Sequence, residues 1–143
     1  MTVQSFDVPS AALFAVLAEP GTYPRWLVGA KRIREVTADW PSAGSSFKHV
    51  VGFGPLAIPD RTTVRAIEAP LMLELLVRAR PLLAAVVRYE VEDLGSGCKL
   101  RMNETPVGIY KFIAPVARPL IRRRNERSLR RLLAVVSSAT RAV

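Results

Sequence analysis

Hydrophobic and polar residues alternate through the middle of the chain with the period of two that is typical of strands buried on one face. The alternation is clearest in residues 84–92, where Ala85, Val87, Tyr89 and Val91 share one parity and the charged Arg88, Glu90 and Glu92 lie on the other. Similar segments are separated by turn residues such as Pro70 and Pro81. We therefore predict antiparallel strands at residues 31–39, 45–53, 61–69, 71–80, 84–92 and 98–104.

The start of the chain predicts a strand and two short helices. A strand at residues 3–8 is followed by Pro9-Ser10, which suits a helix start, and Pro20-Gly21 ends that helix. Residues 22–27 are too short and too interrupted by proline for a full strand, so they are interpreted as a second short helix or turn.

A long helix is predicted to close the chain. After a short apolar turn in residues 109–117, it would run from about Pro119, which suits a first helical turn, to about Thr140. Most of its arginines fall opposite its apolar positions. We therefore expect the apolar face to be committed to the core and the basic face to be solvated. The apolar face consists of Ile121, Asn125, Leu129, Leu132 and Val136.

Length and composition limit the class of protein. The chain has 143 residues, of which 50% are hydrophobic, which suits one domain over residues 1–143 with a sizeable core. The N-terminus lacks the basic start and apolar run of a secretory signal, and no apolar stretch approaches the roughly 20 residues of a membrane-spanning helix. We expect a cytoplasmic protein, soluble or at the membrane periphery, that is a monomer or a homodimer.

Several kinds of site are not expected. Cys98 is the only cysteine, so it has no partner for an intrachain disulfide or a thiolate metal cluster. The chain has no P-loop, and residues 52–55 lack the following helix of a dinucleotide motif. One histidine without supporting residues does not make a Ser/His/Asp triad. We therefore expect neither a metal nor a cofactor.

The net charge of +9 is concentrated near the C-terminus. Between Arg118 and Arg131 there are seven arginines and a single acid, Glu126. Such a surface attracts anions, including nucleic acid and acidic lipid head groups. Nucleic acid is not the expected partner, because no aromatic residues are interleaved with the arginines. Peripheral contact with an acidic membrane is left open.

Specific segments add to this pattern: Trp26-Leu27-Val28-Gly29, Trp40-Pro41-Ser42-Ala43-Gly44, His49 to Pro55, Glu104-Thr105-Pro106 and Arg124-Asn125. With the order of one strand, two short helices, six strands and a long helix, they resemble the START-like (SRPBCC) superfamily, in its bacterial polyketide cyclase/dehydrase branch. The resemblance extends over nearly the whole chain. It implies an α+β helix-grip fold, in which a curved antiparallel sheet wraps round the C-terminal helix and leaves a hydrophobic cavity. Members use this cavity to carry lipids, sterols or polyketides, or to catalyse cyclisation, and the fold does not decide among these.

Two side chains are candidates for proton transfer. His49, the only histidine, alternates with Phe47 and Val51 on one face of its strand, where burial would tune its pKa. Glu104 shares the parity of Met102 and could also point into the cavity. Each also has a structural interpretation, as a histidine satisfied by a buried partner and as a carboxylate paired with an arginine.

Other inward positions are candidates for ligand contact. Asn125 on the apolar helix face needs a hydrogen-bond partner, either from the sheet or from a ligand. Trp26 and Tyr89 combine apolar area with a polar tip, although such aromatics are also common in cores. Arg78 and Arg80 alternate opposite apolar residues and are expected to be exposed. The predicted ligand-binding residues are Trp26, Phe47, Val51, Tyr89, Met102, Asn125 and Leu129.

Three functional hypotheses follow. The first is binding or transport of a hydrophobic small molecule, lipid-like or polyketide-like, in a cavity between the sheet and the helix. The second is a cyclase or dehydratase-type enzyme in which His49 and Glu104 transfer protons, which requires both to reach one open volume. The third is a basic surface module that binds nucleic acid or acidic membrane through the arginine-rich helix.

Overall fold

The computed structural model describes residues 1–52, 55–80 and 83–141, which form an α+β fold with one curved seven-stranded sheet. The strands are β1 (Thr2–Phe6), β2 (Ala30–Arg34), β3 (Ser46–Val51), β4 (Ile58–Glu68), β5 (Met72–Ala79), β6 (Leu83–Asp93) and β7 (Cys98–Pro106). All neighbours are antiparallel, in the order β1-β7-β6-β5-β4-β3-β2. From β2 to β7, strands that follow one another in sequence therefore lie side by side.

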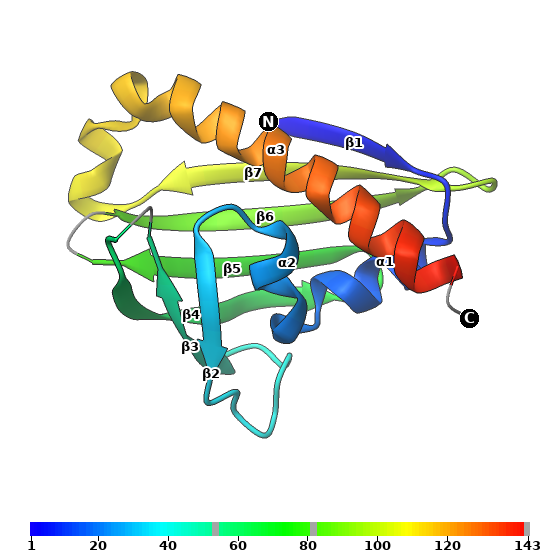
Figure 1. The fold of residues 1–143 in the computed structure, drawn as a ribbon, viewed down its shortest axis with the longest axis horizontal. Coiled ribbons are helices and arrows are strands. Elements are labelled where there is room, and N and C mark those ends of the chain that lie inside the picture. The colour runs from blue at the N-terminus through cyan, green and yellow to red at the C-terminus, as the bar shows by residue number, and fades with distance from the viewer. Residues whose placement is uncertain (53–54, 81–82, 142–143) are drawn as a thin grey trace.

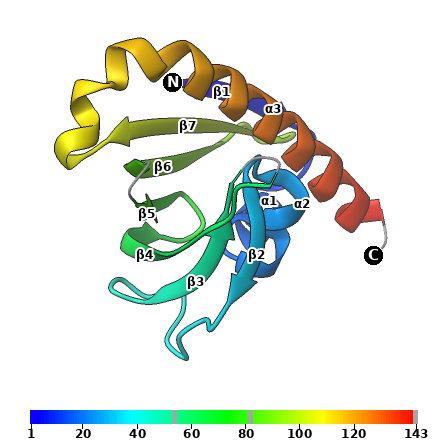
Figure 2. The ribbon, with the colours of Figure 1, turned by 60° about the vertical axis from the view of Figure 1, so that its left-hand side comes forward.

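The helices gather on one face of this sheet. They are α1 (Ser10–Leu17), the 3-10 turn η1 (Pro20–Thr22), α2 (Tyr23–Trp26), the 3-10 helix η2 (Gly108–Phe112) and α3 (Ala114–Arg141). Figure 1 shows α1 and α2 on the same side of the sheet as α3, which runs obliquely across it. In Figure 2 the sheet curves around the helices. The predicted helix-grip arrangement is confirmed.

The buried faces of β6 and α3 follow the predicted periodicities. Val87 and Tyr89 of β6 are at most 5% exposed. Leu129, Leu132 and Val136 of α3 are at most 1% exposed, and they pack against the sheet. Full burial of each such side chain stabilises the fold by about 1.5–3 kcal/mol, and this holds the second half of α3 in place.

A hydrogen bond fixes the same half of α3 against the segment that follows α2. The backbone N–H of Val28 donates to Oγ of Ser128 over 3.0 Å, and Ser128 is fully buried. Sequence reasoning did not select Ser128, although it lies next to Leu129 on the buried side of the helix.

Some predicted strand ends were wrong. The strand expected at residues 31–39 stops at Arg34, because Glu35 takes a left-handed backbone conformation with φ of 49°. The last strand continues beyond Glu104 to Pro106. The predicted strand end at Phe53 and turn at Pro81 lie outside the described residues.

The predicted start of the long helix was also wrong. Helix α3 begins at Ala114, so Pro119 lies inside it and not in its first turn. Proline has no N–H to bond the carbonyl of Pro115 and favours a bend, which Figure 2 shows between the first turns of α3 and the rest. The apolar face is therefore committed to the core only beyond the bend. Val116 and Leu120, before or at the bend, are 84% and 72% exposed.

None of the helices within the described ranges combines the length and the apolar character needed to cross a bilayer.

Candidate ligand cavity

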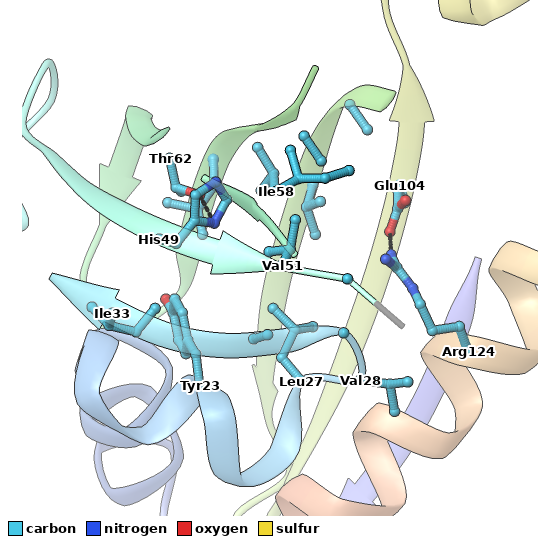
Figure 3. Close-up of a pocket in the computed structure, with 18 of the residues that line it drawn as sticks. Tyr23, Leu27, Val28, Ile33, His49, Val51, Ile58, Thr62, Glu104 and Arg124 are labelled. Atoms are coloured by element: carbon cyan, nitrogen blue, oxygen red, sulfur yellow. Dashed lines mark hydrogen bonds and ion pairs between the residues drawn. The ribbon is translucent and has the colours of Figure 1, made fainter. Parts of the chain in front are cut away.

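An apolar cavity of about 130 Å³ lies between the inner face of the sheet and the segment at the end of α2 (Figure 3). The sheet contributes inward side chains such as Val51 of β3, Val77 of β5 and Val87 of β6. Leu27 and Val28, at the end of α2, form part of the opposite wall. The apolar lining also includes Ile33, Phe47, Leu56, Ile58, Leu75 and Met102.

At one end of the cavity Glu104 of β7 and Arg124 of α3 form an ion pair (Figure 3). Nη2 of Arg124 donates a hydrogen bond to Oε1 of Glu104, and it lies 3.3 Å from Oδ1 of Asn125. The Glu104 side chain is 1% exposed and that of Arg124 is 24% exposed. Among the described residues, neither Oε2 of Glu104 nor Nε of Arg124 has a hydrogen-bond partner. The pair therefore retains one free acceptor and one free donor.

His49 of β3 lines another part of the cavity and has partners of its own. Its Nε2 lies 2.8 Å from the carbonyl oxygen of Arg78, which can only accept, so Nε2 carries the proton. Nδ1 then accepts from the hydroxyl of Thr62 over 3.4 Å. Burial lowers the pKa of His49, and this outweighs the opposing effects of the Arg78 carbonyl and the Asp60 charge. The neutral imidazole is held in one tautomer.

His49 and Glu104 face the same cavity from opposite sides (Figure 3). Strands β3 and β7 are four positions apart in the sheet, roughly 19 Å along its surface. In the described part of the chain no hydrogen bond joins the two side chains, and each is bonded to other residues. The arrangement brings both to one open volume, but it does not make them a directly bonded pair.

The remaining polar groups of the wall offer hydrogen bonds and not metal ligands. Burial raises the pKa of both Tyr23 and Tyr89, and the charge of Glu104 raises that of Tyr89 further. Both phenols therefore stay neutral, and Tyr23 donates to the carbonyl of Leu17 over 2.5 Å. Over residues 1–52, 55–80 and 83–141, no group of three or more His, Cys, Asp or Glu is placed to hold a metal ion.

A wider groove of about 840 Å³ adjoins the cavity. It lies between β7 and the first half of α3, and its walls include Pro106, Lys111 and Arg118. Met102 and Glu104 line both the cavity and the groove. The ion pair of Glu104 therefore lies where the two spaces adjoin.

Residues 1–137 match the family described as polyketide cyclase/dehydrase and lipid transport. The chain belongs to this family. The description covers both enzymes and carriers, so membership supports ligand binding or cyclase activity and does not decide between them. No curated protein matches the sequence.

Solved structures share the fold at low sequence identity. A Thermus thermophilus protein has a TM-score of 0.74 at 12% identity, with 96% of each chain covered. A Rhodobacter sphaeroides protein has a TM-score of 0.75 at 18% identity, covering 95% of this chain and 89% of that one. The di-domain ARO/CYC StfQ, from the steffimycin biosynthetic pathway, has a TM-score of 0.74 at 12% identity, covering 97% of this chain and 50% of StfQ. Likeness at these identities establishes the fold and no ligand.

The predicted site residues fall into two groups. Phe47, Val51, Tyr89 and Met102 line the cavity of this family member, as do His49 and Glu104.

Trp26, Leu129 and Asn125 lie elsewhere. Trp26 is fully buried in the core, where its Nε1 donates to Oγ1 of Thr22 over 3.1 Å and its ring meets Tyr89 edge to face. Leu129 is also a core residue. Asn125 lines the groove and not the cavity. The sequence pattern indicates that these residues face inward. It does not indicate whether they face an open cavity or other side chains of the core.

Sequence reasoning missed the role of Arg124, which it grouped with the solvated arginines. Two signals could have identified it. Arg124 lies four residues before the buried Ser128, so it borders the buried face of the helix. In addition, an inward Glu104 requires a cation.

The expectation for Arg78 and Arg80 is confirmed in part. Arg80 is exposed and donates to both carboxylate oxygens of Asp60, whereas Arg78 is partly buried.

Proposed function

We propose that this protein binds and transports a hydrophobic small molecule, lipid-like or polyketide-like, in the cavity between the sheet and the segment that follows α2, with Arg124 of α3 at one end. The observation that carries the proposal is an apolar space whose polar end has unused hydrogen-bonding capacity, at Oε2 of Glu104 and Nε of Arg124. Buried polar atoms in proteins nearly always have partners, so unpaired atoms at a cavity wall favour a ligand that supplies them. Membership in a family that includes lipid transport supports the same class of function.

The two unpaired atoms indicate the polar group of the ligand. A hydroxyl can donate its proton to Oε2 of Glu104, and a hydroxyl oxygen can accept a hydrogen bond from Nε of Arg124. A ligand carboxylate would be repelled by the carboxylate of Glu104. We therefore propose an apolar ring or chain that carries an alcohol or phenol at one end.

The cavity volume limits the size of the ligand. About 130 Å³ is close to the roughly 150 Å³ of a cavity that holds benzene, and below the roughly 300 Å³ at which pockets for larger ligands begin. A cavity of this volume suits a ligand of about one ring. A larger ligand would have to displace Arg124, which is the more exposed partner of the ion pair, and extend into the groove.

Native mass spectrometry of the protein purified from its own host tests the proposal directly. Denaturing extraction would then identify any small molecule that co-purifies. We expect a stoichiometric apolar compound with a hydroxyl group, and protein that is empty in every preparation would contradict the proposal.

A matched pair of substitutions on β6 tests whether the cavity is the binding site. Ala85 is 1% exposed and lines the cavity, whereas Ala84 is 7% exposed and does not line it. Ala85→Leu should weaken the binding of para-ethylphenol, measured by calorimetry, by roughly tenfold or about 1.4 kcal/mol. Ala84→Leu should leave it unchanged. An equal loss in both variants would indicate a general effect on packing and would count against the cavity.

Proton transfer by His49 and Glu104, in cyclase or dehydratase-type chemistry, is a second candidate function. The observation in its favour is that both residues line one cavity. Their present hydrogen bonds, to Arg78, Thr62 and Arg124, would have to be exchanged for bonds to a substrate. If the extracted ligand is converted by the parent protein but not by His49→Gln or Glu104→Gln variants that still bind it, the chemistry is supported. The chemistry is contradicted if the extracted ligand remains unchanged after incubation with the parent protein.

A further inference from the structure

Five large apolar side chains are exposed together on η2 and the first turns of α3. This apolar cluster consists of Ile109, Phe112, Ile113, Val116 and Leu120, with exposed fractions of 72%, 77%, 47%, 84% and 72%. Ile109 and Phe112 are three residues apart in η2, and Val116 and Leu120 are four residues apart in α3, so each pair lies on one side of its own helix. Figure 1 shows this segment, coloured yellow to orange, at the end of the molecule where β7 ends.

The other large exposed apolar side chains that the structure describes are Met1 and Val3 at the start of the chain and single residues in connections, Val36, Leu56, Leu71 and Leu94. Val36, Leu71 and Leu94 lie in three separate connections between strands, and each is about half exposed. Single exposed side chains of this kind are normal, whereas a contiguous apolar patch marks an interaction surface. The bend at Pro119 explains how the patch arises, because it directs the first turns of α3 away from the sheet.

Three cations, Lys111, Arg118 and Arg123, lie on the same segment as the apolar cluster and line its groove side. Residues 105–125 contain no Asp or Glu. Nζ of Lys111 lies 5.9 Å from the centre of the Phe112 ring. Arg118 and Arg123 are exposed, and neither forms an ion pair with any residue that the structure describes. The segment therefore combines an apolar cluster with uncompensated positive charge along its groove side, which forms a cationic rim.

We propose that η2 and the first turns of α3 dock on an anionic membrane. The apolar cluster enters the interfacial layer, and Lys111, Arg118 and Arg123 contact the lipid phosphates. A second copy of the chain is a poorer partner, because it would bring two cationic rims face to face. Nucleic acid is also poorer, because phosphates offer nothing to five apolar side chains. A bilayer with acidic head groups complements both parts of the surface.

Vesicle flotation with the full-length protein tests this proposal. We expect binding to phosphatidylcholine vesicles that contain about 30% phosphatidylglycerol, little binding to phosphatidylcholine alone, and weaker binding as salt increases. Phe112→Ser/Val116→Ser and Arg118→Ala/Arg123→Ala should each reduce the fraction bound at least several-fold. All four side chains are exposed, so thermal unfolding should be nearly unchanged.

Matched control variants separate this surface from the rest of the molecule. Val36→Ser/Leu94→Ser removes exposed apolar side chains far from η2 in the sequence, and Arg130→Ala/Arg131→Ala removes two exposed arginines later in α3. Both should bind vesicles like the parent. The cavity variant Ala85→Leu should also bind vesicles like the parent. Failure of the docking proposal can therefore be distinguished from failure of the ligand proposal.

Insertion of the cluster can be observed directly. In Phe112→Trp, the fluorescence of the introduced tryptophan, measured as the difference from the parent protein, should shift to shorter wavelength on anionic vesicles. Brominated lipid should quench it. The proposal is overturned if Phe112→Ser/Val116→Ser binds vesicles like the parent, or if Arg130→Ala/Arg131→Ala loses as much binding as Arg118→Ala/Arg123→Ala. It is also overturned if light scattering shows a dimer that the serine substitutions abolish.

Discussion

Arg124 of α3 bonds Oε1 of Glu104 on β7 and leaves Oε2 of the same carboxylate unpaired. Three features meet at this contact. It joins the closing helix to the last strand, it forms the polar end of the cavity, and it lies where the cavity adjoins the groove. A change to either residue should therefore affect both stability and ligand selection.

Loss of Arg124 should destabilise the fold. Arg124→Met keeps much of the apolar stem but leaves the buried carboxylate of Glu104 without a cation, which should lower the free energy of unfolding by roughly 3 kcal/mol. In Glu104→Leu/Arg124→Met no charge is left unpaired, so the double variant should be more stable than Arg124→Met. Urea unfolding at neutral pH measures both. A double variant less stable than Arg124→Met would show that the penalty does not come from the unpaired carboxylate.

The same double variant tests the proposed polar group of the ligand. The parent protein should prefer para-ethylphenol to ethylbenzene by at least roughly tenfold, since a hydrogen bond to a charged group contributes about 1.5–3 kcal/mol. Glu104→Leu/Arg124→Met should bind both compounds with similar affinity. Calorimetric titration of the two ligands decides this, and a phenol preference that survives the double substitution would place the hydroxyl elsewhere in the cavity.

The sheet could be predicted from the sequence because its signals are local. The alternation through Val87 and Tyr89 defines the buried face of β6, and Gly95 to Gly97 mark the turn before β7. The start of α3 could not be predicted in the same way. Proline is common in the first turn of a helix, but Pro119 lies within α3. Whether the helical turns before Pro119 form depends on contacts and solvent exposure, which no local sequence pattern records.

The sequence predicted that the side chains of the candidate site point inward, but it did not predict which residues pair with one another. The inward orientation of Glu104 follows from the parity of Met102, and both line the cavity. Its partner comes from α3, whose rotation on the sheet is set by the packing of the whole core. For the same reason, Trp26 was predicted as a ligand contact although neighbouring side chains already enclose it.

Ser128 should contribute to the position of α3. Ser128→Ala removes the acceptor for the N–H of Val28 and should cost about 1–3 kcal/mol, because the N–H is then left partly buried and unpaired. Ser138→Ala, on an exposed position of the same helix, is the matched control and should be nearly neutral. Thermal or urea unfolding compares the two. Equal effects would mean that helix propensity, and not the hydrogen bond, accounts for the change.

His49 should make the protein less stable in mild acid. In the unfolded chain a histidine titrates near the ordinary pKa of 6.5, whereas burial lowers the pKa of His49 in the folded protein. As the pH falls below 6.5, the unfolded chain therefore gains a proton that the folded protein does not, and the free energy of unfolding decreases until the folded pKa is reached. Above pH 6.5 this residue should cause no pH dependence.

Urea unfolding of the parent and of His49→Gln, at several values between about pH 8 and about pH 5, isolates this effect. The substitution can change the overall stability through the bonds to Arg78 and Thr62, so the slope with pH is the quantity to compare. The parent should lose stability below pH 6.5 more steeply than the variant, because glutamine does not titrate. Equal slopes would show that His49 titrates alike in both states. A parent that gains stability in acid relative to the variant would mean that an acidic group pairs with the imidazolium in the folded protein.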